Sequence, residues 1–319
     1  MGSLFCVGLA RWVGSWCCLA LVACLAAGGA LAKDPGPAGA REYSAYADPE
    51  KPVISYLFSQ KENVQAFKSE FGLDDEEVGR ALAATREEKA RLETEYAESE
   101  RVVEANRELP PEDVGRRIAA TDYDDEVRAA VAGTKSEIES LLPEGRGDDF
   151  GPWVDRRWER EQEEYYQESR LEARRSRPFR CWTIHASWYE SNTKNGYNLE
   201  VALPHKKIKF AGGRHVHVMH DGRSARLPVK EVGPWNLRDN YWAKRKSRDR
   251  WRDLPRCKPE AEAAFFGNYN RGKDQFGRKV ANPAGIDLTL RAAKKMGVKR
   301  KLKRQGIIKV NVRYLWMRR

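Results

Sequence analysis

Apolar and polar positions divide this chain into a helical half and a strand-rich half. In the region 53–142 apolar residues recur at helical spacing. A long helix is predicted from Asp74, an N-cap followed by acidic residues, to Leu109, because two prolines come next. A shorter helix is predicted over 124–142. No chemical motif occurs in this helical region.

The apolar stripe of the long helix is incomplete. Thr85, Lys89 and Ser99 interrupt it, so we expect a long, partly solvated helix, with a coiled coil to a partner or to a second copy as the alternative. The stripe consists of Val78, Leu82, Leu92, Tyr96 and Val103.

Two polar segments flank the helical region. Residues 33–52 are mostly Pro, Gly, Ala and charged residues, which predicts a linker without a core. Residues 143–178 are densely charged and end at Pro178, which predicts a connector helix.

Beyond Pro178 the pattern changes to short alternating runs separated by Gly, Asn and Asp. Strands are predicted near 181–189, 215–219, 225–229 and 307–315, and one short helix over 288–296. The expected fold is therefore α+β, with a helical region followed by an all-β domain at 179–319.

The first 32 residues resemble an export signal. An apolar stretch from Val13 to Leu31 ends in Ala30-Leu31-Ala32, and a Pro/Gly-rich stretch follows. We expect cleavage there and a secreted, extracellular or cell-envelope protein. A membrane-spanning anchor and a lipid anchor at Cys24 are the alternatives.

Cysteine usage agrees with export. Four of the six cysteines lie within the signal, which leaves Cys181 and Cys257 in the mature chain. In an oxidising compartment these two are expected to form a disulfide, and two buried thiols are the alternative. No Cys/His spacing typical of zinc accompanies them.

Charge is distributed unevenly along the chain. Residues 179–319 hold 34 Lys and Arg against 11 Asp and Glu, a balance of +23, whereas residues 1–178 hold 24 against 36, a balance of −12. Such a basic domain needs anionic surroundings. Nucleic acid is disfavoured by the export signal, which leaves anionic polymers of the cell envelope or a membrane surface.

Several short motifs occur in order within 181–316. They are Ala186-Ser-Trp-Tyr189, Ala202-Leu-Pro-His205, Asp221-Gly-Arg-Ser224, Glu231-Val-Gly-Pro-Trp235 and Ile286-Asp-Leu-Thr-Leu-Arg-Ala-Ala293. With these motifs the segment resembles the rare lipoprotein A family, related in fold to expansins and to the membrane-bound lytic transglycosylase A group. The resemblance implies a six-stranded double-psi β-barrel that acts on bacterial peptidoglycan.

The sequence also departs from that family. Glu231-Val232 stands where the family has Asp-Arg, and a long insert occupies 236–285. A disulfide from Cys257 to Cys181 would tie this insert to the first strand, so we expect it to be an ordered cover.

The resemblance implies a lytic transglycosylase, in which one carboxyl both gives and takes a proton while a sugar hydroxyl closes an anhydro ring. It places the acid/base at Glu231, with His205 and Asp287 assisting. The ordinary alternatives are a solvated strand-end carboxylate for Glu231, a turn residue for His205 and a helix N-cap for Asp287. The altered Glu231-Val232 pair leaves a non-catalytic, expansin-like wall-binding protein open as the alternative function, and an extracellular binder of another polyanion as a third.

Aromatic residues near the motifs are candidates for stacking on sugars, although aromatic residues also fill small cores. The candidates are Trp188, Tyr189, Trp235 and Trp242. His215 and His217 share a strand face but lack an evident third ligand, so we expect surface histidines, no metal and no cofactor.

Overall fold

The computed structural model describes residues 44–175, 180–190, 198–209 and 213–317, and Ser44–Arg319 form one compact unit. The predicted signal, including Cys24, lies outside the described residues. Within the described residues, no helix combines the length and the apolar character needed to cross a membrane.

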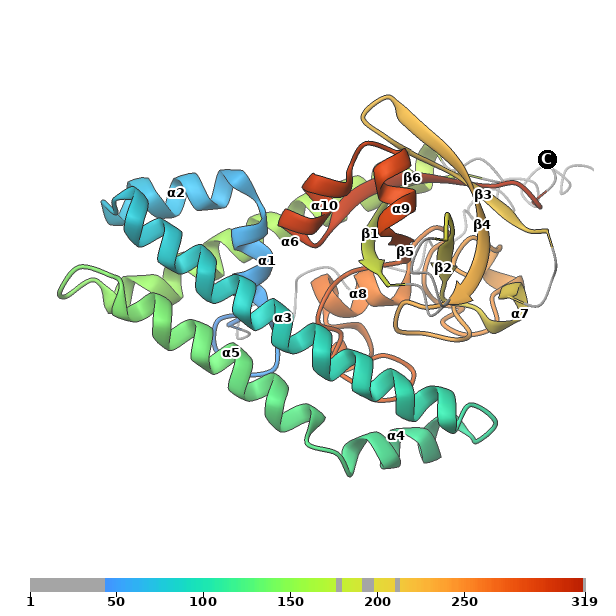
Figure 1. Cartoon of the computed structure of the whole chain (residues 1–319), viewed down its shortest axis with the longest axis horizontal. Coiled ribbons are helices and arrows are strands. Elements are labelled where there is room, and N and C mark those ends of the chain that lie inside the picture. The colour runs from blue at the N-terminus through green and yellow to red at the C-terminus, as the bar shows by residue number, and fades with distance from the viewer. Residues whose placement is uncertain (1–43, 176–179, 191–197, 210–212, 318–319) are drawn as a thin grey trace, which may run out of the picture. The chain divides into compact units, whose positions relative to one another are not determined.

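The C-terminal half is a closed barrel of six strands (Figure 1). Around the barrel the order is β1-β5-β2-β4-β3-β6, and the pairs β1–β5 and β2–β4 are parallel. This confirms the predicted α+β fold with a six-stranded barrel. The strands are β1 (Arg180–Tyr189), β2 (Val201–Leu203), β3 (His215–His220), β4 (Arg223–Val232), β5 (Ile286–Thr289) and β6 (Ile308–Tyr314).

Alternation along the strands fills the barrel interior. Ile184 and Ala186 of β1 are buried in it, as are Ile286 and Leu288 of β5. The residues between them therefore point to the outer face of the barrel. Short helices α7 (Lys206–Lys209), α9 (Leu290–Lys295) and α10 (Lys299–Gln305) lie between strands.

In the part of the chain that the structure describes, six helices precede the barrel. Helix α3 begins with a capping box. The Asp74 carboxylate accepts a hydrogen bond from the Glu77 backbone N–H, and the Glu77 carboxylate accepts one from the Asp74 backbone N–H. The helix ends at Ala105, short of the predicted Leu109. The helices are α1 (Val53–Ser59), α2 (Lys61–Phe71), α3 (Asp75–Ala105), α4 (Pro111–Ala119), α5 (Tyr123–Ser140) and α6 (Gly147–Arg175).

Helix α3 packs against α5 and α1 of the same chain (Figure 1). Its residues Val78, Ala81, Leu92 and Val103 are buried in these contacts. Its incomplete apolar stripe is therefore covered within the chain.

The described parts of the two polar segments beside the helical region contribute to its core. The predicted helix within 143–178 is present as α6 but is more than a connector, and residues 44–52 of the predicted linker are packed, whereas residues 33–43 lie outside the described residues. In α6, Trp153 and Trp158 are buried among aromatic side chains. Ala45 is buried as well, and the Tyr46 N–H donates to Asp155 Oδ1 over 3.0 Å. Residues 44–52 therefore pack on α6, and α6 is a core helix whose exposed faces carry the charge.

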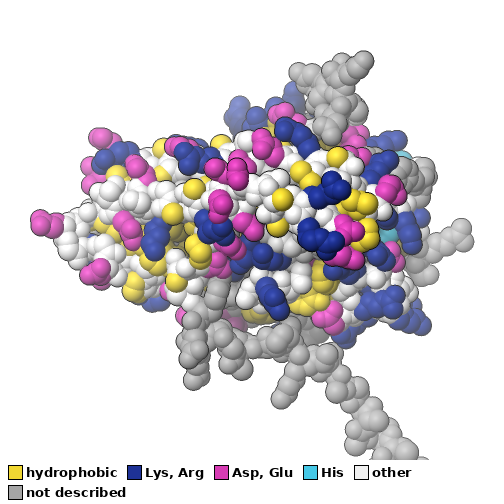
Figure 2. Space-filling model, turned by 90° about the horizontal axis from the view of Figure 1, so that it is seen from below, with side chains coloured by type: hydrophobic (Ala, Val, Ile, Leu, Met, Phe, Trp, Pro, Cys, Tyr) yellow, Lys and Arg dark blue, Asp and Glu magenta, His cyan; other side chains and the backbone are white. Residues whose placement is uncertain are grey.

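The insert at 236–285 joins the helical core. Its helix α8 (Glu260–Gly267) buries Phe266, which stacks on Trp158 of α6 with ring centroids 5.6 Å apart. The predicted disulfide between Cys181 and Cys257 is confirmed, with Cα atoms 5.2 Å apart. The insert is thus held by both the barrel and the helices. On the face drawn in Figure 2, Lys and Arg side chains are prominent at the barrel end.

Candidate active site

Four adjacent strands place both predicted carboxyl residues, Asp287 and Glu231, in one row across the sheet. Ser187 of β1 pairs with Asp287 of β5, Asp287 pairs with Ala202 of β2, and Ala202 pairs with Glu231 of β4. Residues in one row of a sheet share a face, so Asp287 and Glu231 flank Ala202 on the outer side of the barrel. We call these four residues the carboxyl row.

A β-bulge brings Glu231 into this row. Leu227 and Val229 of β4 point into the barrel, so strict alternation would send position 231 inward as well. The register between β2 and β4 shifts after Val229, and Glu231 then lies opposite Ala202. An extra residue in one strand re-aims the side chain that follows it.

Asp287 is a residue of the carboxyl row whose pKa is shifted. Its side chain is buried, with 8% of the residue exposed. Burial raises the pKa of Asp287 to about 7, and the nearby charge of Glu100 adds to this effect. The Ser187 hydroxyl donates a hydrogen bond to Asp287 Oδ1, and this bond opposes the rise in pKa. Asp287 can therefore hold a proton near neutral pH.

Tyr189 lies beside the carboxyl row. Its hydroxyl donates to Glu200 Oε1 over 3.4 Å. Burial, then the charges of Glu200, Glu231 and Asp287, raise the pKa of Tyr189, so the phenol stays protonated and remains a donor. Sequence reasoning assigned no role to Glu200 or Ser187. The strand register reveals the place of Ser187, and the hydrogen bond from Tyr189 reveals that of Glu200.

The turn after β4 approaches Asp287 closely. A Cβ built on Gly233 would lie 3.8 Å from Asp287 Oδ2, and Gly233 has a φ of 143°, which favours glycine. Two residues later, Trp235 packs on Tyr96 of α3 with ring centroids 4.4 Å apart. Helix α3 therefore supports the turn that lies against Asp287.

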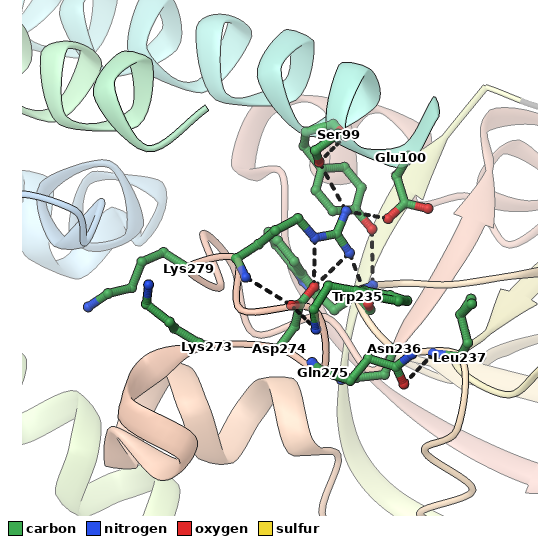
Figure 3. Close-up of polar contacts among 12 residues, drawn as sticks. Ser99, Glu100, Trp235, Asn236, Leu237, Lys273, Asp274, Gln275 and Lys279 are labelled. Atoms are coloured by element: carbon green, nitrogen blue, oxygen red, sulfur yellow. Dashed lines mark hydrogen bonds and ion pairs between the residues drawn. The ribbon is translucent and has the colours of Figure 1, made fainter. Parts of the chain in front are cut away.

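The buried guanidinium of Arg278 donates hydrogen bonds to the turn, to helix α3 and to the insert. Its Nη2 donates to the Trp235 carbonyl oxygen over 3.0 Å, and its Nη1 donates to Glu100 Oε1 over 2.6 Å. Its Nε donates to Asp274 Oδ2 over 2.7 Å. Figure 3 shows Ser99 and Glu100 of α3 facing the two segments that carry Trp235 and Asp274. One side chain thus joins α3, the turn and the insert.

The structure gives His205 a different environment. The residue follows β2, and its ring Nε2 lies 3.0 Å from Asp249 Oδ2 of the insert. Burial lowers the pKa of His205, and Asp249 opposes this effect. The ring also packs edge-on against Trp242. These contacts anchor the insert to the end of β2.

Three of the four predicted stacking residues belong to packed regions. Trp188 packs against the barrel core, on the opposite side of β1 from Ser187 and Tyr189. Trp235 is 2% exposed and Trp242 is 4% exposed. Tyr189 is the member of this set that lies at the carboxyl row.

The N-cap alternative for Asp287 is wrong. Helix α9 begins at Leu290, and the Thr289 side chain accepts the capping hydrogen bond from the Ala292 N–H. Asp287 lies within β5 instead. Its carboxyl is therefore free of a capping role.

Among the described residues, no cluster of three or more His, Cys, Asp or Glu side chains is suited to a metal ion. His215 Nδ1 lies 2.7 Å from the Gly213 carbonyl oxygen. Both His215 and His217 are partly exposed.

Residues 183–311 are similar to one protein family, whose description reads Domain of unknown function (DUF8814). The match runs from β1 to β6 and includes the insert. No curated protein and no solved structure matches the chain significantly. The matching family is not rare lipoprotein A, so that resemblance depends on the motifs and on a closed six-stranded barrel.

Proposed function

We propose that this protein cleaves glycan strands of peptidoglycan as a lytic transglycosylase, with Asp287 as the acid/base. One observation carries the proposal: Asp287 is a buried carboxyl whose pKa is raised to about 7, in a row with Ser187 and Glu231. An acid that also acts as a base works best when its pKa is close to the working pH.

The reaction needs one carboxyl and no water. Protonated Asp287 gives its proton to the bridging oxygen as the bond from C1 of N-acetylmuramic acid to that oxygen breaks. The C6 hydroxyl oxygen of the same sugar then bonds to C1, and its proton returns to Asp287. Atoms and charge balance in these steps. Glu231 contributes a negative charge beside the reacting groups, and the Tyr189 phenol, whose O–H donates to Glu200, lies next to them.

The roles differ from those expected from the sequence. The sequence places the acid at Glu231, but Asp287 is the more buried of the two carboxyls, and burial raises the pKa of Asp287 to about 7. We assign Glu231 to stabilising positive charge at C1 in the transition state. His205 is a positioning residue that holds the insert through Asp249.

The choice of a double-psi barrel and of peptidoglycan rests on the resemblance. The motifs that include Ser187, Ala202, Glu231 and Asp287 fall on four neighbouring strands, as one site requires. Export through residues 1–32 belongs to the same proposal, and a disulfide suits an oxidising compartment. Basic side chains on the barrel half would attract anionic wall polymers.

A second candidate is a non-catalytic, expansin-like wall-binding protein. The burial of Asp287 favours it, because a sugar must reach the carboxyl for cleavage. So does Trp235, whose ring is covered by Tyr96 and is unavailable for stacking.

Mass spectrometry of digested peptidoglycan separates the two candidates. The full mature chain is incubated with intact peptidoglycan and with glycan stripped of stem peptides. The enzyme proposal predicts anhydro-muramyl ends from wild type and from the control Asp148→Asn, which changes an exposed residue of α6, and none from Asp287→Asn. Binding to the glycan without anhydro ends from wild type would support the second candidate.

A further inference from the structure

A cavity of about 420 Å³ lies away from the carboxyl row, between the helical region and the barrel. The outer face of β1, β3 and β6 forms one wall, and α1, α2 and α10 contribute side chains to the others. Cavities of this size at junctions between structural units are common sites for small ligands. None of the carboxyl-row residues lines it.

The sheet wall presents polar side chains in register. His185 of β1 pairs with Lys309 of β6, and Asn311 of β6 pairs with Met219 of β3. The Asn311 side-chain oxygen also accepts from the Thr183 N–H over 3.1 Å. All five residues line the cavity, so its floor is built by strand pairing.

His185 offers a buried nitrogen without a protein partner. The residue is 2% exposed, and its Nδ1 lies 3.0 Å from Glu262 Oε1. The same oxygen accepts the backbone N–H of His185 over 2.8 Å. Because a carboxylate oxygen accepts, Nδ1 carries a proton, and Nε2 has no hydrogen-bond partner among the described residues. Buried polar atoms without partners call for an explanation.

Thr183 adds a second unusual feature to the same wall. Its φ is 56°, in the left-handed region that β-branched residues avoid. It lies at a register shift between β1 and β6. Backbone strain of this kind gathers at functional sites, where the surrounding structure maintains it.

The two lysines that line the cavity are paired with carboxylates, and Glu62 adds a further carboxylate to the lining. Lys301 lies 3.5 Å from Asp221 Oδ2, and Lys309 lies 2.9 Å from Glu168 Oε2. A strongly charged ligand would therefore find no uncompensated charge in these two pairs. The remaining polar lining includes the side-chain amides of Gln60, Gln305 and Asn311. Amides both donate and accept, which suits hydroxyl and acetamido groups.

We propose that this cavity binds a neutral, hydroxyl-rich sugar unit. His185 and Asn311 on the sheet wall and Gln305 on α10 provide the polar contacts. This site goes beyond the proposed cleavage reaction and does not depend on Asp287.

The test measures binding by the full mature chain with N,N′-diacetylchitobiose as the neutral probe and glucuronic acid as the charged probe. Calorimetry should show saturable binding of the neutral sugar and weaker binding of the acid. Each of Gln305→Ala and Asn311→Ala should weaken neutral-sugar binding about tenfold, the effect of losing a good hydrogen bond.

Two controls keep the outcome interpretable. Gln167→Ala removes an exposed amide of α6 that lies outside the cavity lining, and it should bind like wild type. Asp287→Asn should also bind like wild type, which separates this site from the cleavage site. Absence of saturable binding to the neutral sugar by folded wild type would overturn the proposal, and so would unchanged binding by both cavity variants.

Discussion

The backbone N–H of Trp235 donates a hydrogen bond to the phenol oxygen of Tyr96 over 3.0 Å. Trp235 follows the turn that lies against Asp287, and Tyr96 belongs to α3. The helical region therefore forms part of the wall around the carboxyl row.

Replacing Arg278 should destabilise this wall. In Arg278→Met the buried Asp274 loses its ion-pair partner, and breaking a buried pair costs about 3–5 kcal/mol. Urea denaturation followed by tryptophan fluorescence measures the loss. Arg238→Met, an exposed residue of the same insert, should change stability by less than about 0.5 kcal/mol. Equal effects from the two variants would show that the Arg278 contacts contribute little.

The burial of Asp287 should make stability depend on pH. Its folded-state pKa of about 7 lies above the ordinary value of 3.8, so the folded protein binds the proton more tightly than the unfolded chain. The resulting stability is complete below the ordinary value and is lost as pH rises through about 7. The variant Asp287→Asn should keep its stability over this range, because its amide does not titrate. Unfolding free energies of the two proteins should therefore diverge between pH 4 and pH 7 in favour of the variant, whereas parallel curves would contradict the raised pKa.

Removing the disulfide should weaken the whole fold. Cys181 and Cys257 are 76 residues apart, and closing so long a loop is worth about 4 kcal/mol in the chain-entropy model. The double variant Cys181→Ala/Cys257→Ala should unfold at lower urea than wild type. A reducing agent should lower the wild-type midpoint towards that of the variant and leave the variant unchanged. Equal midpoints for wild type and the variant under oxidising conditions would be evidence against a stabilising bridge.

Contact between the insert and α6 should appear as energetic coupling. Trp158→Ala and Phe266→Ala each remove a buried aromatic ring from the same stack and should each cost about 3–5 kcal/mol. Together they should cost less than their sum by roughly 0.5–1.5 kcal/mol, because the second change removes a contact that is already lost. A double-mutant cycle in urea measures this value, and strict additivity would mean that the rings do not interact.

Local patterns were sufficient to predict much of the fold. Asp74 and its acidic neighbours predicted the start of α3 to within one residue. The alternation of apolar and polar residues predicted β1, β3 and β6. The disulfide followed from having two cysteines left after the predicted signal. These features depend on residues close in sequence or on a simple count.

Long-range partners could not be predicted in this way. The charged faces of α6 concealed a buried stripe that includes Trp153 and Trp158, and nothing near Phe266 indicates that it packs there. The bulge that turns Glu231 outward depends on pairing with β2, a strand too short to show alternation. Which of the two predicted carboxyl residues, Glu231 or Asp287, is the more deeply buried therefore emerged only from the structure.

The protonation of Asp287 tests the central claim most directly. Carbon-13 NMR of aspartate-labelled protein can follow its carboxyl signal through a pH titration, with Asp287→Asn identifying the resonance. The account predicts a midpoint at about 7. A midpoint near the ordinary value of 3.8 would contradict it, because the carboxyl would then have no proton to give at neutral pH.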